Sequence, residues 1–244
     1  MQTTPTQSRR LRDYTNTPFE IFVAALTALP FLALAYFYPA IPERVPLFLT
    51  LGGEVETWGS KSLLSVFRVP LMALVTQLFC LSMKYGALKS EPAAPFQGAD
   101  ARTAESRERY LGLWARLWDC FRCAAAIKMS AASLNTVFLS VGALGFLSRP
   151  AYAVTAAAAL LSAAGALFYG YRLLAVRREL RGRHGDLNIP KPPDGRRVYA
   201  GLFYFDPSDP SPFARGHLLN LANGWAWVFV ACLLAYPLLV FLPA

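Results

Sequence analysis

Five apolar stretches, each about as long as a membrane is thick, constrain the fold of this chain more than any other feature. They run over Phe19–Tyr38, Leu63–Met83, Ala124–Leu147, Ala151–Val176 and Trp225–Leu242. A bilayer core about 30 Å thick requires about 20 apolar residues in a helix, because hydrocarbon leaves no partner for an unpaired backbone group. The stretches therefore predict an all-α, polytopic bundle of five transmembrane helices.

The composition of the chain agrees with a membrane protein. Hydrophobic residues make up 55% of its 244 residues and charged residues only 16%, whereas soluble domains carry about 25% charged residues. A cleaved signal peptide over the first stretch is the competing interpretation. That apolar run exceeds the roughly 7–15 residues of the apolar region of a signal peptide, and an anchored first helix is therefore favoured.

The charge of the connecting segments predicts the direction in which the helices cross. Eighteen Lys and Arg residues fall in the N-terminal tail and in the segments that follow the second and fourth stretches, against three on the other side, Arg44, Lys61 and Arg149. Because cytoplasmic segments carry the excess of positive charge, we expect the N-terminus inside and the C-terminus outside. The net charge of +9 then indicates attraction to anionic membrane lipid, and nucleic acid is not an expected partner.

These assignments divide the chain into six segments. They are a cytoplasmic tail over 1–18, a two-helix module over 19–84 with an ordered outer loop at 40–62, a cytoplasmic linker and helix over 85–123, a transmembrane hairpin over 124–176, a cytoplasmic segment over 177–224, and a last transmembrane helix over 225–244.

Apolar residues of Glu105–Phe121 form one helical stripe with two tryptophans. This favours an amphipathic helix in the headgroup layer, with an N-terminal extension of the third span as the alternative.

Among the polar residues of the apolar stretches, we single out Arg68, Lys128 and Asn135, because an ionisable or strongly polar residue at membrane depth is a functional candidate by default. Arg68 and Lys128 are close enough to a membrane surface to extend their charges toward the headgroups, and a role in binding or conduction is the alternative. Asn135 lies two helical turns beyond Lys128 and is expected to make an interhelical hydrogen bond. Small residues recur at every fourth position of the fourth stretch, which predicts close helix packing; they are Ala158, Ser162, Ala166 and Gly170.

Enzyme motifs are missing from the sequence. It contains no His-Glu-x-x-His, no Gly-x-Ser-x-Gly and no glycine-rich phosphate loop, and it has only two histidines. We therefore expect a protein that is not an enzyme, with no catalytic residue, no metal site and no cofactor. Acidic residues at membrane depth are also missing apart from Glu20, which argues against proton-coupled transport.

The outer loop carries the most specific motif of the chain. Its proline, glycine and aromatic residues predict a rigid cap at the membrane surface; the motif residues are Pro42, Pro46, Phe48, Gly53, Trp58 and Lys61. This pattern resembles an uncharacterised family of bacterial multispanning membrane proteins, whose loop reads Pro-x-x-Ile/Val-Pro-x-His-Phe and then Gly-x-x-Asp-x-Trp-x-x-Lys. The same module begins the SdpI-type immunity proteins. Leu47 stands where the family often has His, and Glu56 where it often has Asp.

A second motif is similar to a short Tyr-Asn-Pro-x-Asp-Pro…Asn segment that accompanies this module in some relatives. It is carried by Asp206, Pro207, Asp209 and Asn220, after a predicted short strand over Val198–Phe205. The paired Asp residues are expected to hydrogen-bond the turn backbone, with cation binding as the alternative.

The two resemblances imply a multi-pass protein of the bacterial plasma membrane with sensory or immunity-like binding of a peptide or a membrane-protein partner. The outer loop, with Trp58 and Lys61, would be the receiving surface. The alternative is a small transporter or channel subunit that uses the three intramembrane polar residues along a pore.

Overall fold

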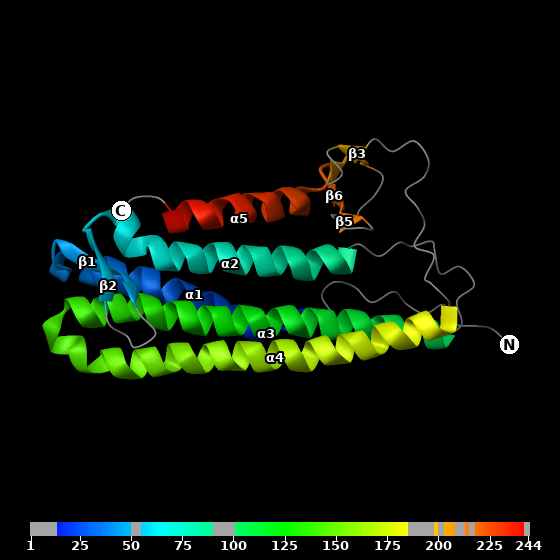
Figure 1. The fold of residues 1–244 in the computed structure, drawn as a ribbon, viewed down its shortest axis with the longest axis horizontal. Helices are drawn as coiled ribbons and strands as arrows, with labels where there is room; N and C mark the ends of the chain where they lie inside the picture. The colour runs from blue at the N-terminus through cyan, green and yellow to red at the C-terminus, as the bar shows by residue number, and fades with distance from the viewer. Residues whose placement is uncertain are drawn as a thin grey trace.

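In the computed structural model, the described part of the chain forms a bundle of five helices (Figure 1). The structure describes residues 14–49, 55–89, 101–184, 198–199, 203–207, 213–214 and 218–241. The helices are α1 (Thr17–Phe37), α2 (Leu63–Lys89), α3 (Ala101–Ser140), α4 (Ser148–His184) and α5 (Gly224–Phe241). Two 3-10 turns, η2 (Tyr38–Ala40) and η3 (Gly142–Leu147), follow α1 and precede α4. Consecutive helices run in opposite directions along the long axis of the bundle.

Four of these helices are long and apolar enough to cross a membrane. The qualifying segments among the described residues are Thr17–Ala40, Leu63–Gly86, Glu108–Ser140 and Leu144–Val176. The apolar part of α5, Gly224–Leu239, is shorter. A mostly helical protein with several candidate spans is thus confirmed, whereas the fifth crossing and the orientation of the termini stay predictions.

The fold also contains two small β-sheets, which the all-α prediction misses. Strands β1 (Arg44–Leu49) and β2 (Val55–Ser60) form an antiparallel hairpin at one end of the bundle. The other sheet lies at the opposite end and has the order β3-β4-β6-β5, with β4 and β6 parallel. Its strands are β3 (Val198–Tyr199), β4 (Phe203–Tyr204), β5 (Phe213–Ala214) and β6 (Leu218–Asn220). The predicted strand over Val198–Phe205 is therefore two strands that pair with each other.

Glu105–Phe121 belongs to α3, one continuous helix of 40 residues. This agrees with the alternative of an N-terminal extension of the third span, and a position in the headgroup layer stays a prediction. The apolar stripe of this segment packs on the neighbouring helices. Leu113 lies in a buried cluster with Leu173 and Val176 of α4. On the side of α2, the indole of Trp114 donates a hydrogen bond to the Met83 carbonyl at 3.1 Å.

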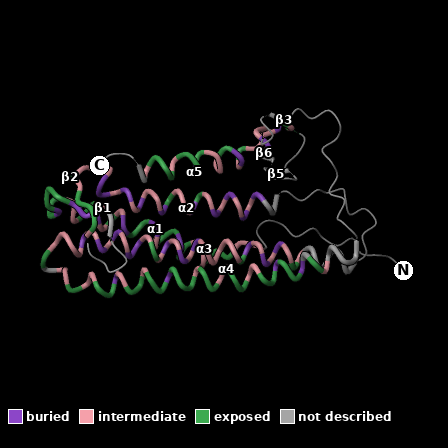
Figure 2. The backbone as a smooth tube through the Cα atoms, viewed as in Figure 1, coloured by how far each residue is buried: buried purple, intermediate pink, exposed green. Residues whose placement is uncertain are grey.

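Burial is concentrated where α1, α2 and α3 face one another, and the outer faces of α4 and α5 are largely exposed (Figure 2). The exposed side chains of α4 include large apolar residues such as Leu160 and Leu167, as expected of a surface that faces lipid. Against α3, α4 packs closely: a Cβ added at Gly165 would overlap the sulfur of Cys120. Gly165 is not one of the four small residues named from the sequence. Of those, Ala158 is buried at 2% exposure, whereas a Cβ added at Gly170 would meet no atom within 4 Å.

Candidate functional site

Four charged side chains from three helices form the strongest polar feature of the bundle. Arg122 of α3 donates two hydrogen bonds to Glu20 of α1, with Nη2–Oε2 at 2.7 Å and Nη1–Oε1 at 3.0 Å. Lys84 of α2 donates to both carboxylate oxygens of Asp119 of α3 at 2.8 Å. Weaker contacts join the two pairs, since Lys84 Nζ lies 3.5 Å from Glu20 Oε1 and Arg122 Nη1 lies 3.4 Å from Asp119 Oδ1. We call these four residues the charged cluster.

The charged cluster is electrically neutral and largely buried. Lys84 is 0% exposed and Arg122 4%, whereas the two acids keep about a fifth of their side-chain surface. Gln77 of α2 completes the hydrogen bonding: it donates to the Arg122 carbonyl at 2.9 Å and accepts from Arg122 Nε at 3.2 Å. Buried charges are tolerated when they are paired and hydrogen-bonded. The cluster therefore joins α1, α2 and α3 near the end of the bundle where α1 begins.

Sequence analysis does not identify this cluster. By sequence, Lys84 counts as one of the basic residues that follow the second span, whereas the structure places it inside α2 facing Asp119. The available signal was Glu20, because an acid at the start of an apolar helix needs a basic partner at the same depth. The identity of that partner depends on how three helices pack, which spacing along the chain does not reveal.

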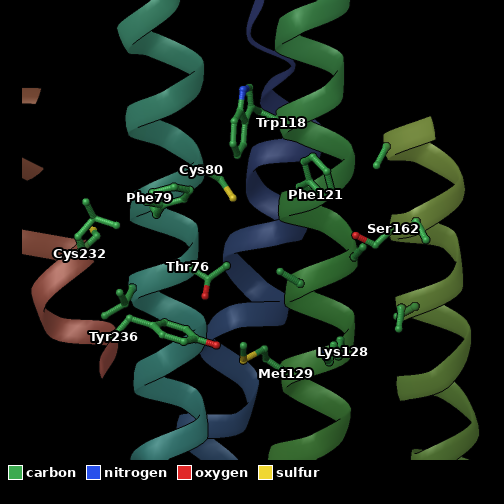
Figure 3. Close-up of a pocket in the computed structure, with 18 of the residues that line it drawn as sticks. Thr76, Phe79, Cys80, Trp118, Phe121, Lys128, Met129, Ser162, Cys232 and Tyr236 are labelled. Atoms are coloured by element: carbon green, nitrogen blue, oxygen red, sulfur yellow. The ribbon is translucent and has the colours of Figure 1, made fainter. Parts of the chain in front are cut away.

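An apolar pocket of about 790 Å³ begins at the level of the charged cluster, between α2, α3, α4 and α5 (Figure 3). Aromatic and sulfur-containing side chains dominate its wall; they include Phe79, Cys80, Trp118, Phe121, Met129 and Cys232. Small residues of α4 line the opposite side, among them Ala158, Ser162 and Ala166. Its volume lies within the roughly 300–1,000 Å³ of small-molecule sites, so the pocket is large enough for an apolar ligand.

Of the three intramembrane polar residues, Lys128 alone lines this pocket. It lies nine residues beyond Asp119 on α3, which is about 13 Å along a helix. Its side chain is exposed, and among the described residues it has no ion-pair partner. Arg68 and Asn135 are buried at 5% and 4% exposure, and Asn135 Oδ1 finds no hydrogen-bond partner within the described residues. The three residues are therefore not assembled around this pocket.

The β1–β2 hairpin holds the motif residues of the outer loop. Pro46 lies opposite Trp58 in the register, and Phe48 lies in β1 opposite β2. Pro42 is exposed just before β1, and Gly53 lies outside the described residues. Trp58 is 54% exposed, so its indole is accessible to a partner or to lipid headgroups.

Lys61, in contrast, is engaged within the chain. Its Nζ donates to the Ile41 carbonyl at 2.7 Å and lies 4.8 Å from the centroid of the Tyr38 ring. These contacts tie the start of α2 to the end of α1 below the hairpin. Leu47, which stands where the family often has His, packs over Gly59 so closely that a Cβ added there would lie 2.5 Å from Leu47 Cδ1. Lys61 thus holds the hairpin in place. Its expected part in a receiving surface stays a prediction.

The second motif is brought together by the parallel pairing of β4 and β6. Asn220 is 0% exposed. Its Oδ1 accepts from the backbone N–H of Asp206 and of Ala222 at 3.1 Å each, and its Nδ2 donates to the Asp206 carbonyl at 2.9 Å. Pro207 follows as a turn residue, and Asp209 lies outside the described residues. Asn220 therefore has a structural role: it fixes the sheet that leads into α5.

These features define what the structure can do chemically. The charged cluster is a closed network of ion pairs, the pocket offers an apolar cavity, and the hairpin presents an exposed aromatic side chain. In the ranges that the structure describes, no three His, Cys, Asp or Glu side chains are grouped so that they could hold a metal ion.

Residues 25–74 match a family model described as Domain of unknown function (DUF1648). The matched range covers most of α1, the β1–β2 hairpin and the first half of α2, and so includes the motif from Pro42 to Lys61. No curated protein and no solved structure matches the chain. The match supports similarity to an uncharacterised domain family over the hairpin module.

Proposed function

We propose that the chain is a five-span protein of the bacterial plasma membrane, with its N-terminus inside and its C-terminus outside. The alternating helix directions support this topology, because the hairpin and the end of α5 lie at one end of the bundle and the four-stranded sheet at the other (Figure 1). The excess of Lys and Arg in the segments at the sheet end favours that end as the cytoplasmic one. With 18 residues, α5 extends about 27 Å, which is close to the thickness of the hydrocarbon core.

The proposed function is sensory or immunity-like binding of a peptide or a membrane-protein partner at the outer face, without catalysis. The observation that carries this proposal is Trp58, a large side chain that is more than half exposed on a hairpin fixed by Lys61. Aromatic residues on rigid elements dominate binding interfaces, because they bury much surface and lose little conformational entropy. Lys61 contributes indirectly, since it positions the hairpin.

The test is purification of the tagged full-length protein from its native membrane in mild detergent, followed by mass spectrometry of the proteins that accompany it. Trp58→Ala is compared with Phe146→Ala, because Phe146 is also exposed, at 74%, and lies in η3 at the same end of the bundle. A stoichiometric partner that is lost only with Trp58→Ala supports the proposal. A partner that both variants retain, or a homo-oligomer without a partner, contradicts it.

A small transporter or channel subunit is the second candidate, and the pocket beside Lys128 is the observation that favours it. A cation that lines an apolar pocket between membrane helices is a typical feature of a substrate pathway. This function predicts solute flux in liposomes that contain the purified protein, and a changed rate or selectivity for Lys128→Met. Flux equal to that of protein-free liposomes would exclude this function for the solutes tested.

A further inference from the structure

A second cavity, of about 600 Å³, lies between the N-terminal part of α3 and the C-terminal part of α4. Three arginines line it: Arg109 and Arg116 from α3, and Arg172 from α4. The two arginines of α3 are seven residues apart and therefore lie on one face of that helix. Gly112 lies between them, and a Cβ added there would meet no atom within 4 Å. The missing side chain leaves open space between the arginines.

The positive charge of this cavity is not neutralised by its surroundings. The side chains of Arg109, Arg116 and Arg172 are exposed, and among the described residues none of them forms an ion pair. Glu108 and Glu179 also line the cavity, but both are engaged in interactions of their own. Even with these two acids counted against the three arginines, the lining has a net charge of +1, and the cavity is suited to an anion.

The bounds of the candidate spans indicate that the cavity is near a membrane surface. Arg109 and Arg116 fall in the first turns of the apolar segment of α3, and Arg172 falls four residues before the end of that of α4. Aromatic side chains, which gather where a membrane meets water, surround this level; they are Tyr110, Trp114, Tyr169 and Tyr171. A ligand in the cavity would therefore contact guanidinium groups and hydrocarbon at the same time.

We propose that this cavity binds the phosphate-bearing headgroup of an anionic glycerophospholipid. A guanidinium group pairs with phosphate oxygens through two parallel hydrogen bonds, and basic pockets between membrane helices are suited to such headgroups. A surface for the acyl chains is provided by exposed apolar residues of α4 that precede Arg172 in the helix. They are Leu160, Leu161 and Leu167. The inference rests on the bundle being embedded in a membrane and is independent of partner binding at the hairpin.

The test is native mass spectrometry of the purified full-length protein titrated with phosphatidylglycerol or phosphatidylcholine. The double variant Arg109→Gln/Arg116→Gln is compared with Arg178→Gln, a matched control because Arg178 is exposed on α4 and does not line the cavity. We expect the wild type and the control to retain one phosphatidylglycerol in preference to phosphatidylcholine. The double variant should bind it at least about tenfold more weakly, since each basic residue near the surface contributes about 1 kcal/mol.

A second variant tests the cavity without changing its charge. Gly112→Leu should fill the open space beside the arginines and weaken phosphatidylglycerol binding, while the fold has room for the new side chain. Inorganic phosphate is added in a further arm, and displacement of the lipid by phosphate would show a site for the free ion, which overturns the proposal. Equal retention of the two lipids, or binding that neither the double variant nor Gly112→Leu weakens, also overturns it.

Discussion

Replacing Lys84 by methionine should strongly destabilise the bundle, because the change leaves a carboxylate without its main partner. Lys84 is fully buried, and its Nζ lies 2.8 Å from both oxygens of Asp119. Methionine is also long and unbranched, so the substitution removes the charge with little loss of packing. The charged cluster then has a net charge of −1, and Asp119 keeps only the contact with Arg122 at 3.4 Å.

The expected magnitude follows from the burial of the cluster. Removing one partner of a buried ion pair costs about 3–5 kcal/mol, because the remaining charge is left uncompensated. The Asp119 side chain keeps 21% of its surface exposed, and this access to water places the cost near the lower limit, about 3 kcal/mol. For a chain of this size that loss corresponds to a fall in Tm of about 6–12 °C. The double variant Lys84→Met/Asp119→Leu should recover much of the loss, because it removes the unpaired carboxylate as well.

The assay is the Tm of the purified full-length protein in detergent, measured by size-exclusion chromatography after heating. Lys128→Met is the matched control, because Lys128 is exposed and has no ion-pair partner among the described residues. The control should shift Tm by no more than about 2 °C. Equal shifts for Lys84→Met and Lys128→Met, or a double variant no more stable than Lys84→Met alone, would refute the reasoning.

Three further changes test other contacts. Lys61→Met removes a hydrogen bond from a charged donor, worth about 1.5–3 kcal/mol, so amide hydrogen exchange in β1 and β2 should become faster; unchanged exchange would contradict the role of Lys61 in holding the hairpin. Asn220→Ala leaves buried backbone groups unbonded at about 1–3 kcal/mol each, and limited proteolysis should then cut the four-stranded sheet sooner than in the wild type. Gly165→Leu should lower Tm, because forcing α3 and α4 apart costs about 1–3 kcal/mol of stability. Gly170→Leu should leave Tm unchanged, because a Cβ at Gly170 meets no atom within 4 Å. Equal effects of the two variants would show that close packing at Gly165 is unimportant.

The candidate membrane spans could be predicted from the sequence because length and apolar character are local properties of a segment. The β1–β2 hairpin could not, since β1 contains Pro46, and proline within an apolar run argues against a strand. The hairpin also depends on distant contacts: Val45 of β1 is buried with Val66 of α2 and Val137 of α3. Such contacts are determined by helix packing and leave no pattern in the loop itself.

Of the candidate site, only the features that a local motif encodes could be predicted from the sequence. Trp58 was identified from its motif, and the structure shows it exposed. The engagement of Lys61 depends on a carbonyl 20 residues earlier in the chain, and the charged cluster depends on residues up to 102 positions apart. In sequence each member of the cluster resembles an ordinary residue flanking a membrane span, and only the assembled bundle pairs them.

The length of α3 has a mechanical consequence. From Asp119 back to Ala101 the helix continues for 18 residues beyond the charged cluster, about 27 Å at 1.5 Å per residue. Since α4 packs against α3 both at Leu113 and at Cys120, the two helices would tilt together, and a small tilt at the hairpin end would produce an opposite sweep at the far tip. Distances between spin labels, measured with and without a partner at the hairpin, would reveal this sweep, and unchanged distances would exclude it. A movement at one face of the membrane would then be transmitted to a protein bound at the other end of α3, and no part of the helix would need to refold.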